Sequence, residues 1–276
     1  MAESAPFSVL LPVYGGDVPA YVERAVISVT TDQTLRPTEL VIVVDGPVGP
    51  GLTTVLDRAG ELAGGVPVRF VALPENLGLA RALEAGLAAC AHEVVARADA
   101  DDISLPSRFA RQVPLVAGGV DLLGSAITEF EADERSPGLT RSLPTDAGDI
   151  AAMARFRDPF NHPSVVYRRS AVRLAGGYEH VDKMEDYWLF VRMIATGARV
   201  ANLPESLVLY RVGAGAYGRR GGGSMLRSEL RLQSLMLRAG FTSWSQALRN
   251  VIVRGGYRFV PAGLRRLMYK VMVTRR

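Results

Sequence analysis

The chain has 276 residues, 48% of them hydrophobic and 22% charged, a composition typical of folded globular proteins rather than disordered ones. At this length we expect one α/β domain or two small domains. The single cysteine, Cys90, excludes an intramolecular disulfide framework and a cysteine-rich zinc site. No apolar run approaches the roughly 18 residues of a membrane-spanning helix, and the first residues lack the basic region of a signal peptide.

Charge is distributed unevenly along the chain. Residues 211–276 carry 14 Lys and Arg against one acid, Glu229, a net charge of +13. Residues 1–210 carry 18 basic and 27 acidic residues, a net charge of −9. Such an asymmetry indicates an anionic partner for the C-terminal segment. We expect no nucleic acid, because aromatic residues are sparse in that segment and no recognition motif is present.

The first 110 residues alternate between strand-like and helix-like patterns. Short apolar, β-branched runs predict strands, and apolar residues at helical spacing predict helices. This order predicts an α/β fold with a mostly parallel central sheet and helices on both faces. The expected strands are residues 7–13, 39–44, 66–73 and 94–98, and the expected helices are residues 18–31, 52–62 and 78–91.

The pattern is less regular after residue 110. One or two strands are expected within residues 120–130, a polar loop within residues 129–144, and a strand over residues 161–168. Residues 183–196 show helical spacing, and residues 203–212 give a last strand. The glycine-rich residues 213–224 are not expected to be ordered without help from other groups.

Two amphipathic helices are expected in the C-terminal segment. Ser243, followed three residues later by Gln246, forms a capping-box pattern, and Gly255 ends that helix. Pro261 suits the first turn of a second helix. Its apolar residues repeat at helical spacing among basic ones, which favours either a membrane interface with anionic lipid or a helix docked on the main domain. These apolar residues are Leu264, Leu267, Met268, Val271 and Met272.

Three carboxylates follow the expected strand at residues 94–98. Asp99, Asp101 and Asp102 repel one another unless a cation lies among them. Mg²⁺ and similar hard cations take one or two carboxylates and complete their ligands with substrate phosphates and water. The pattern therefore predicts a metal-bridged diphosphate. The alternative is a solvated acidic turn in which Asp102 or Ser104 caps the next helix.

A second acid, Asp45, also follows an expected strand and stands in an Asp-Gly-Pro turn. Ligands of parallel α/β sheets bind beyond the carboxyl ends of the strands. Asp45 and the acids at Asp99 therefore can face one crevice. A carboxylate in the position of Asp45 can accept from a base N–H or a ribose hydroxyl, while the alternative is an ordinary turn residue.

Six segments together resemble bacterial glycosyltransferases of family 2, and the resemblance covers about residues 6–215. It implies a GT-A type fold, a nucleotide-binding sandwich. Residues 1–110 would form the nucleotide-sugar half, residues 111–215 the acceptor half, and residues 216–276 a flexible lid and a basic amphipathic helical tail. The segments, in chain order, are LLPVYGG at residue 10, VVDGP at 43, ENLGLARALEAGL at 75, ARADADDISLPSRF at 96, NHPSVVYRRS at 161 and MEDYWLFVRM at 184.

The resemblance implies inverting transfer of a sugar from a nucleotide diphosphate to an acceptor hydroxyl. Asp101 and Asp99 would hold Mn²⁺ or Mg²⁺, and Asp186 would be the general base. The alternative for Glu185 and Asp186 is a pair of acids that stabilises a helix N-terminus. The alternative for Asn76 is a structural role as a helix cap. Nucleotide or donor binding would fall to Pro12, Val13, Tyr14, Asp45, Asn76, Arg81, Asp99, Ala100 and Asp101, and sugar or acceptor contacts to Asp102, Asn161, His162 and Glu185.

The glycine-rich segment matches a dinucleotide fingerprint in letters only, because no apolar helix follows it. We interpret it as a lid that closes over the donor and excludes water. Arg219 and Arg220 would then meet the diphosphate. A structural role for His162 is the alternative to a sugar contact.

The predicted enzyme is a metal-dependent hexosyl- or N-acetylhexosaminyltransferase. Its donor would be a UDP-sugar and its acceptor a glycan or polyprenyl-linked glycan in cell-surface polysaccharide synthesis. We expect it in the cytoplasm, peripheral on the plasma membrane. One alternative is a HAD-like phosphohydrolase, whose signature residues 99–103 approximate, although that signature belongs near the chain start. Another is a non-catalytic membrane scaffold that binds nucleotide sugar.

Overall fold

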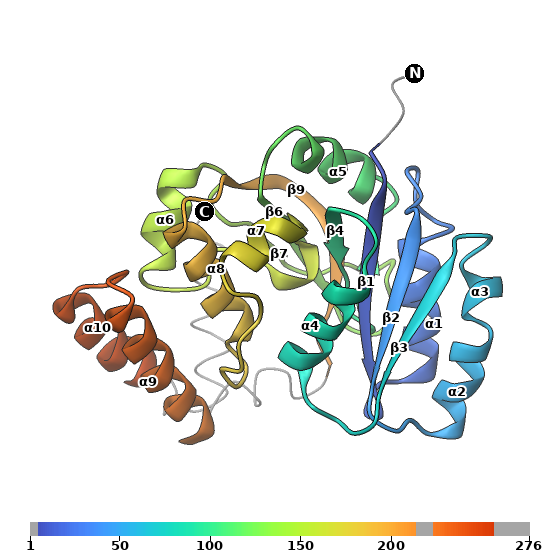
Figure 1. Ribbon diagram of the computed structural model, residues 1–276, viewed down its shortest axis with the longest axis horizontal. Helices are drawn as coiled ribbons and strands as arrows, with labels where there is room; N and C mark the ends of the chain where they lie inside the picture. The colour runs from blue at the N-terminus through green and yellow to red at the C-terminus, as the bar shows by residue number, and fades with distance from the viewer. Residues whose placement is uncertain (1–4, 214–222, 257–276) are drawn as a thin grey trace.

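A computed structural model describes residues 5–213 and 223–256. One twisted sheet carries helices on both of its faces (Figure 1). The strand order is β3-β2-β1-β4-β8-β6-β9-β5, with β7 paired to β6 outside this path. The strands are β1 (Phe7–Tyr14), β2 (Glu39–Asp45), β3 (Val68–Leu73), β4 (Val94–Arg97), β5 (Ile103–Ser104), β6 (Leu122–Phe130), β7 (Thr140–Arg141), β8 (Val166–Arg168) and β9 (Val200–Arg211).

The helices of the first half match the predicted ones in place, with one break. The expected helix over residues 52–62 is divided into α2 and α3 at Arg58, which lies between them. The helices are α1 (Pro19–Val29), α2 (Pro50–Asp57), α3 (Ala59–Leu62), α4 (Leu79–Ala89), α5 (Arg108–Ala117), α6 (Ala147–Ala154), the 3₁₀ helix η1 (His162–Ser164), α7 (Arg169–Leu174), α8 (Glu185–Ala195), α9 (Gly223–Arg238), α10 (Trp244–Asn250) and the π-helical turn η2 (Val251–Gly255).

The first four strands are parallel, as the alternating pattern predicted. Successive side chains of a strand point to opposite faces, so the buried runs of β1 and β2 fill two layers. Val9 and Leu11 join a core with α1, α2 and α5, while Leu10 and Val43 join a second core with α4 and α8. The sheet is therefore buried on both faces, as parallel sheets require.

The register of β1, β2 and β3 brings their carboxyl ends to the same edge of the sheet. Tyr14 pairs with Asp45, and Asp45 pairs with Leu73, so β1, β2 and β3 end at one edge. The strand β4 ends earlier, with Arg97 opposite Leu10. The chain from residue 98 to residue 102 therefore passes across the end of the sheet, beside the end of β1.

The strands of the second half of the chain pair in both parallel and antiparallel directions. The long β6–β9 ladder is parallel, whereas the short pairings of β8 with β4 and β6, and of β9 with β5, are antiparallel. The strand β6 is a single strand, and β7 lies inside the segment that was expected to be a loop. The expected strand over residues 161–168 begins instead with the 3₁₀ helix η1, and only residues 166–168 pair in the sheet.

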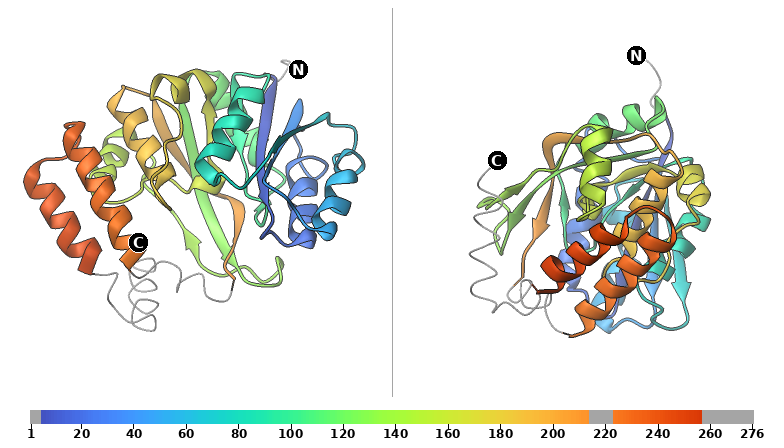
Figure 2. Two further views of the ribbon diagram at one scale, coloured as in Figure 1. Left: turned by 60° about the horizontal axis from the view of Figure 1, so that its bottom comes forward. Right: turned by 90° about the vertical axis from the view of Figure 1, so that its left-hand side faces the viewer.

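The C-terminal helices α9 and α10 lie at the end of the molecule opposite α2 and α3 (Figures 1 and 2). The capping box of Ser243 and Gln246 is confirmed in both of its hydrogen bonds. The helix α9 was not predicted, because its buried side includes Ser228, Glu229 and Gln233, which hide the apolar pattern. The second expected helix, from Pro261 on, lies outside the described residues.

Within residues 5–213 and 223–256, no helix combines the length and the hydropathy that crossing a membrane requires.

We predict opposite effects for two Gly→Ala substitutions in helices. At Gly86 in α4 the added methyl carbon would lie 2.2 Å from Leu10 Cδ1 and 2.7 Å from Val43 Cγ2, so these fully buried side chains or the helix must shift. Overpacking of this kind costs about 1–3 kcal/mol. Gly60 in α3 has no atom within 4 Å of the same position, so Gly60→Ala gains only helix propensity, up to about 1 kcal/mol.

Urea unfolding of the two variants measures this difference. Gly86→Ala should unfold at a lower urea concentration than the wild type, and Gly60→Ala at an equal or higher one. Equal stabilisation of both variants would contradict the close packing of α4 on β1 and β2.

Candidate functional site

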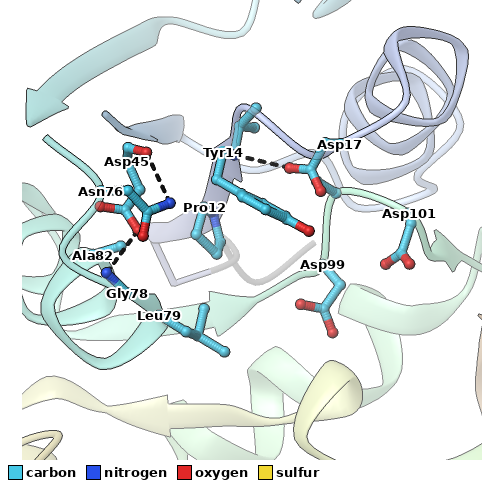
Figure 3. A pocket seen from close by; sticks show the side chains of 12 residues that line it. Pro12, Tyr14, Asp17, Asp45, Asn76, Gly78, Leu79, Ala82, Asp99 and Asp101 are labelled. Carbon is cyan, nitrogen blue, oxygen red and sulfur yellow. Dashed lines mark hydrogen bonds between the residues drawn. The ribbon is translucent and has the colours of Figure 1, made fainter. Parts of the chain in front are cut away.

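A pocket of about 370 Å³ opens at the carboxyl ends of β1, β2 and β4 (Figure 3). It has the size of a small-molecule site. All of the predicted donor-binding residues except Arg81 line it, so Asp45, Asp99 and Asp101 do face one crevice. The lining residues are Pro12, Val13, Tyr14, Asp17, Asp45, Asn76, Gly78, Leu79, Ala82, Asp99, Ala100 and Asp101.

Asp45 holds the loop after β3 against the end of β2. Its buried carboxylate accepts hydrogen bonds from the N–H groups of Leu77, at 2.7 Å, and Gly78, at 3.0 Å. Gly46 follows with φ = 82°, and a Cβ atom there would lie 2.5 Å from the backbone nitrogen of Asn76. Glycine is therefore required at this turn. These contacts form one wall of the pocket before any ligand arrives.

Tyr14 places its ring over the pocket. The side chain is half exposed, and Figure 3 shows the ring pointing toward the side of Asp99 and Asp101. The Tyr14 backbone N–H donates to the Asp17 carboxylate at 2.9 Å, which fixes the turn after β1. Burial, together with the charges of Asp101 and Asp99, raises the pKa of Asp17 to about 6, although the Tyr14 hydrogen bond opposes this.

The acids Asp99, Asp101 and Asp102 converge after β4. Each offers a carboxylate oxygen, and the three oxygens lie within 4.8 Å of one another. Burial and the neighbouring Asp99 charge raise the pKa of Asp101 to about 6 and that of Asp102 well above its usual value. Burial is the larger cause of both shifts, and the Asp99 charge adds a repulsion that a cation would relieve.

Arg97, on β4, is the buried cation closest to these acids. Only 2% of its side chain is exposed, and its guanidinium binds both carboxylate oxygens of Asp99. Burial alone would lower the pKa of Arg97, but the Asp99 charge raises it above the ordinary value. The guanidinium therefore stays charged and sets the orientation of Asp99.

Asp102 does not cap the next helix. Its Oδ1 accepts from the backbone N–H of Arg211 at 2.8 Å, and its Oδ2 is buried without a hydrogen-bond partner among the described residues. Ser104 likewise does not cap a helix, because it lies in β5. Three close carboxylates, one with an unsatisfied buried oxygen, fit a hard divalent cation such as Mn²⁺ or Mg²⁺. Asp99 and Asp101, both partly open to the pocket, are suited to hold it.

A second group of acids lies at the start of α8. Lys183 turns the chain with φ = 59°, a backbone conformation that is uncommon outside glycine. Asp186 Oδ1 then accepts from the Tyr187 N–H at 2.7 Å, and Asp186 Oδ2 lies 3.6 Å from Nδ1 of His162. The other ring nitrogen of His162 is 2.9 Å from the Tyr178 hydroxyl.

Burial disfavours the charged forms of His162, Glu185 and Asp186. It lowers the pKa of His162 well below 6.5, with the Arg97 charge adding to the effect, so the imidazole is neutral at pH 7. Burial also raises the pKa of Asp186, and burial together with the Asp186 charge raises the pKa of Glu185 to about 7. A carboxylate with a raised pKa, partly open to solvent, suits a general base.

Asn161 is buried and bonded within the protein. Its side-chain oxygen accepts from Arg141 Nε at 2.7 Å, and its nitrogen donates to the Ser125 carbonyl at 2.9 Å. A direct contact with a sugar therefore has to exchange one of these bonds. Arg81 lies exposed on the first turn of α4 and does not line the pocket, while Arg219 and Arg220 lie outside the described residues.

The structure adds four residues that the sequence alone did not single out: Asp17, Arg97, Asp158 and Arg211. Asp158 is linked to the second group of acids, because burial and then the Asp186 charge raise its pKa well above its usual value. Arg211 ends β9 and donates from Nε to the Asp101 carbonyl at 2.9 Å. Of these four residues, only Arg97 carried a signal in the sequence, because it is a charged residue within an apolar strand.

The chain is similar in sequence to known glycosyltransferases. A family model described as Glycosyl transferase family 2 matches residues 8–174. The amylovoran biosynthesis glycosyltransferase AmsE of Erwinia amylovora is 37% identical over 264 residues, 96% of this chain and 98% of the relative. The UDP-Gal:alpha-D-GlcNAc-diphosphoundecaprenol beta-1,3-galactosyltransferase of Escherichia coli is 32% identical over 278 residues, 100% of this chain and 99% of the relative.

Solved structures agree on the fold. The mannosyltransferase PcManGT of Pyrobaculum calidifontis, in complex with GDP-Man and Mn²⁺, superimposes with a TM-score of 0.66 at 16% identity, covering 95% of this chain and 72% of that one. The S. aureus TarS fragment 1–349 with UDP-GlcNAc gives 0.65 at 14% identity, covering 89% and 70%. Together with the family match and the two close relatives, this fold places the chain in glycosyl transferase family 2, as a glycosyltransferase of the GT-A type.

Proposed function

We propose that the protein transfers a sugar, with inversion, from a UDP-sugar to a hydroxyl of a glycan or polyprenyl-linked acceptor in cell-surface polysaccharide synthesis. The proposal rests mainly on one observation: Tyr14, Asp45, Asp99 and Asp101 line the same pocket. The half-exposed Tyr14 ring suits a base, and the Asp45 carboxylate at a strand end suits a ribose. The acids Asp99 and Asp101 suit a metal-bound diphosphate.

The nucleotide would bind along the strand ends. The Tyr14 ring can stack on the base, and the Asp45 carboxylate, already fixed by two backbone N–H groups, keeps free lone pairs for a base N–H or a ribose hydroxyl. Asn76 and Gly78, from the same loop, complete this wall.

Asp99 and Asp101 would hold Mn²⁺ or Mg²⁺ at the diphosphate end of the pocket. When bound, the ion supplies positive charge to the departing phosphate oxygens. Arg97 keeps Asp99 oriented from the protein side. Arg211 donates its backbone N–H to the Asp102 carboxylate and its side-chain Nε–H to the Asp101 carbonyl. The acids are thus positioned by two cations before the donor binds.

Asp186 would take the proton of the acceptor hydroxyl. In a single displacement the acceptor oxygen bonds to the anomeric carbon as the bond to the diphosphate oxygen breaks, which inverts that carbon. The proton moves to Asp186, and the electron pair leaves with the nucleoside diphosphate. Neutral His162, 3.6 Å away, packs against Asp186 without neutralising it.

UDP is favoured over GDP by the relatives. The Escherichia coli relative that aligns with 100% of this chain at 32% identity is named for a UDP-Gal donor and a diphosphoundecaprenol acceptor. The structure with GDP-Man shares only 16% identity, so it supports the fold alone. The acceptor proposal rests on the same relative, and the polysaccharide proposal on the amylovoran enzyme as well. The sugar type, hexosyl or N-acetylhexosaminyl, stays a prediction.

The proposed location is the cytoplasmic face of the plasma membrane, where a polyprenyl-linked acceptor would be reached. The expectation that residues 261–272 contact an anionic membrane stays a prediction, because those residues lie outside the described ranges. The same holds for the proposed lid of Arg219 and Arg220.

Replacing Asp186 with Asn should abolish base catalysis. We expect a fall in kcat of about 10²–10⁴, because the amide cannot accept the proton, and an unchanged Kd for UDP, because Asp186 does not line the nucleotide pocket. Asp182→Asn, at an exposed acid of the preceding turn, is the control and should keep its activity. Sugar transfer with undiminished kcat in Asp186→Asn would remove Asp186 as the base, and absence of turnover in the wild type would favour the scaffold.

Replacing Asp101 with Asn should weaken metal binding. The Kd of Mn²⁺, measured in the presence of UDP from the EPR signal of the free ion, should rise by about tenfold or more. The control is Asp57→Asn, an exposed acid on α2. An unchanged Mn²⁺ affinity would place the ion elsewhere or exclude it from this site.

Replacing Tyr14 tests the base-binding wall. Tyr14→Ala should weaken UDP binding by about 1–3 kcal/mol, the range of base–aromatic stacking, whereas Tyr14→Phe keeps the ring and should bind UDP nearly as the wild type does. Calorimetry with UDP, GDP and dTDP measures both the loss and the base preference. Equal UDP affinities for the Ala and Phe variants would rule out stacking, and tighter binding of GDP would overturn the choice of UDP.

A further inference from the structure

The helix formed by α10 and η2 presents an apolar row to solvent. The exposed fractions are 78% for Trp244, 60% for Leu248 and 63% for Ile252. These residues follow one another at intervals of four, so they lie along one side of the helix. We call them the Trp244 row. Large apolar side chains grouped in this way on a protein surface mark a contact with another molecule.

The side of this helix that faces the protein is polar. Asn250, fully buried, donates to the Arg155 carbonyl at 2.8 Å and to Gln233 Oε1 at 2.9 Å. Arg254 donates to the Phe156 carbonyl at 2.6 Å and lies 2.9 Å from the fully buried Glu229 carboxylate.

The rotation of the helix is therefore fixed by its polar contacts. Rolling the helix to bury Trp244 would break these bonds and separate the buried Glu229 charge from Arg254, and breaking a buried ion pair in this way is strongly destabilising. The apolar row is held outward by the fold.

Charge identifies the occupant of the row. After Glu229 the chain has ten basic residues and no acidic residue. A second copy docked by the same row would bring two such segments together, and like charges disfavour this contact. An anionic surface complements them, and a Trp beside aliphatic residues suits the boundary between lipid headgroups and acyl chains.

We propose that the Trp244 row docks on an anionic lipid bilayer, with the α10–η2 helix lying in the plane of the interface. The row inserts its apolar side chains, and the anionic headgroups complement the net positive charge of the sequence that follows Glu229. The inference deepens the proposed function, on which it rests only in that a polyprenyl-linked acceptor lies in such a bilayer. The docking itself requires no turnover.

Tryptophan fluorescence of the full chain tests the contact at one residue. The chain has two tryptophans, Trp244 and Trp188, and only 5% of Trp188 is exposed. With vesicles of phosphatidylcholine and phosphatidylglycerol, the emission should shift to the blue and be quenched by brominated acyl chains. Pure phosphatidylcholine should produce little change. In Trp244→Phe, where Trp188 alone reports, the shift should be absent.

A co-sedimentation assay measures the affinity. Leu248→Ser combined with Ile252→Ser should weaken binding to the anionic vesicles by about tenfold or more, in line with roughly 25 cal/mol per Å² of apolar surface withheld from the interface. Phe70→Ser, at an exposed apolar residue of the edge strand β3, is the control and should bind as the wild type does. UDP binding should be unchanged in every variant, which separates this test from that of the proposed function.

Three outcomes would overturn the proposal. The first is equal vesicle affinity of the double variant and the wild type. The second is a wild-type dimer in analytical ultracentrifugation that the double variant converts to a monomer, which would make a second copy the occupant. The third is a Trp244 emission that is blue without vesicles and shifts to the red on deletion of residues 257–276, which would make that segment the occupant.

Discussion

The candidate site depends on one buried cation, the Arg97 guanidinium. It binds Asp99 beside the pocket, and its charge opposes the burial that raises the pKa values of Asp101 and Asp102. At the start of α8 it opposes the effect of burial on Glu185 and Asp186 in the same way. Acids that would repel one another in a low-dielectric site thereby share one buried positive group.

The same electrostatics supports the proposal of a metal ion at this site. Arg97 is engaged with Asp99, and Arg211 is engaged with the backbone of Asp101 and of Glu131. In the proposed function a diphosphate would add further negative charge beside three carboxylates, and a metal ion at their open side would offset it. The arginines would then order the acids, and the metal ion would supply positive charge to the leaving group.

Much of this fold was predictable from local patterns. The parallel strands have continuous apolar runs, and the turn residues at Asp45 mark a strand end, so the position of the pocket followed from the rule that ligands bind at such ends. The second half was less predictable, because β7 pairs over only two residues and η1 replaces half of an expected strand. The helix α9 was missed because its buried side carries Glu229 and Gln233, which bond each other and the distant residues Arg254 and Asn250.

The site shows the same division. Residues in motifs, such as Asp99 and Asp186, could be named from the sequence, whereas Asp17, Asp158 and Arg211 come to the site by tertiary contacts that no local pattern encodes. Arg211 is the clearest case. It stacks its guanidinium 3.8 Å from the Tyr21 ring centroid and 4.3 Å from that of Phe130, while its backbone holds Asp102.

The position of Arg211 has a mechanical consequence. Only residues 212–222 separate this arginine from the start of α9, so the acid cluster and the C-terminal helices share a short covalent connection. Arg211 donates its backbone N–H to the Asp102 carboxylate and its side-chain Nε–H to the Asp101 carbonyl. The proposed metal site and α9, which bonds the helix that carries the Trp244 row, are therefore close in sequence, so a change in the position of either one has only eleven residues of chain in which to be absorbed.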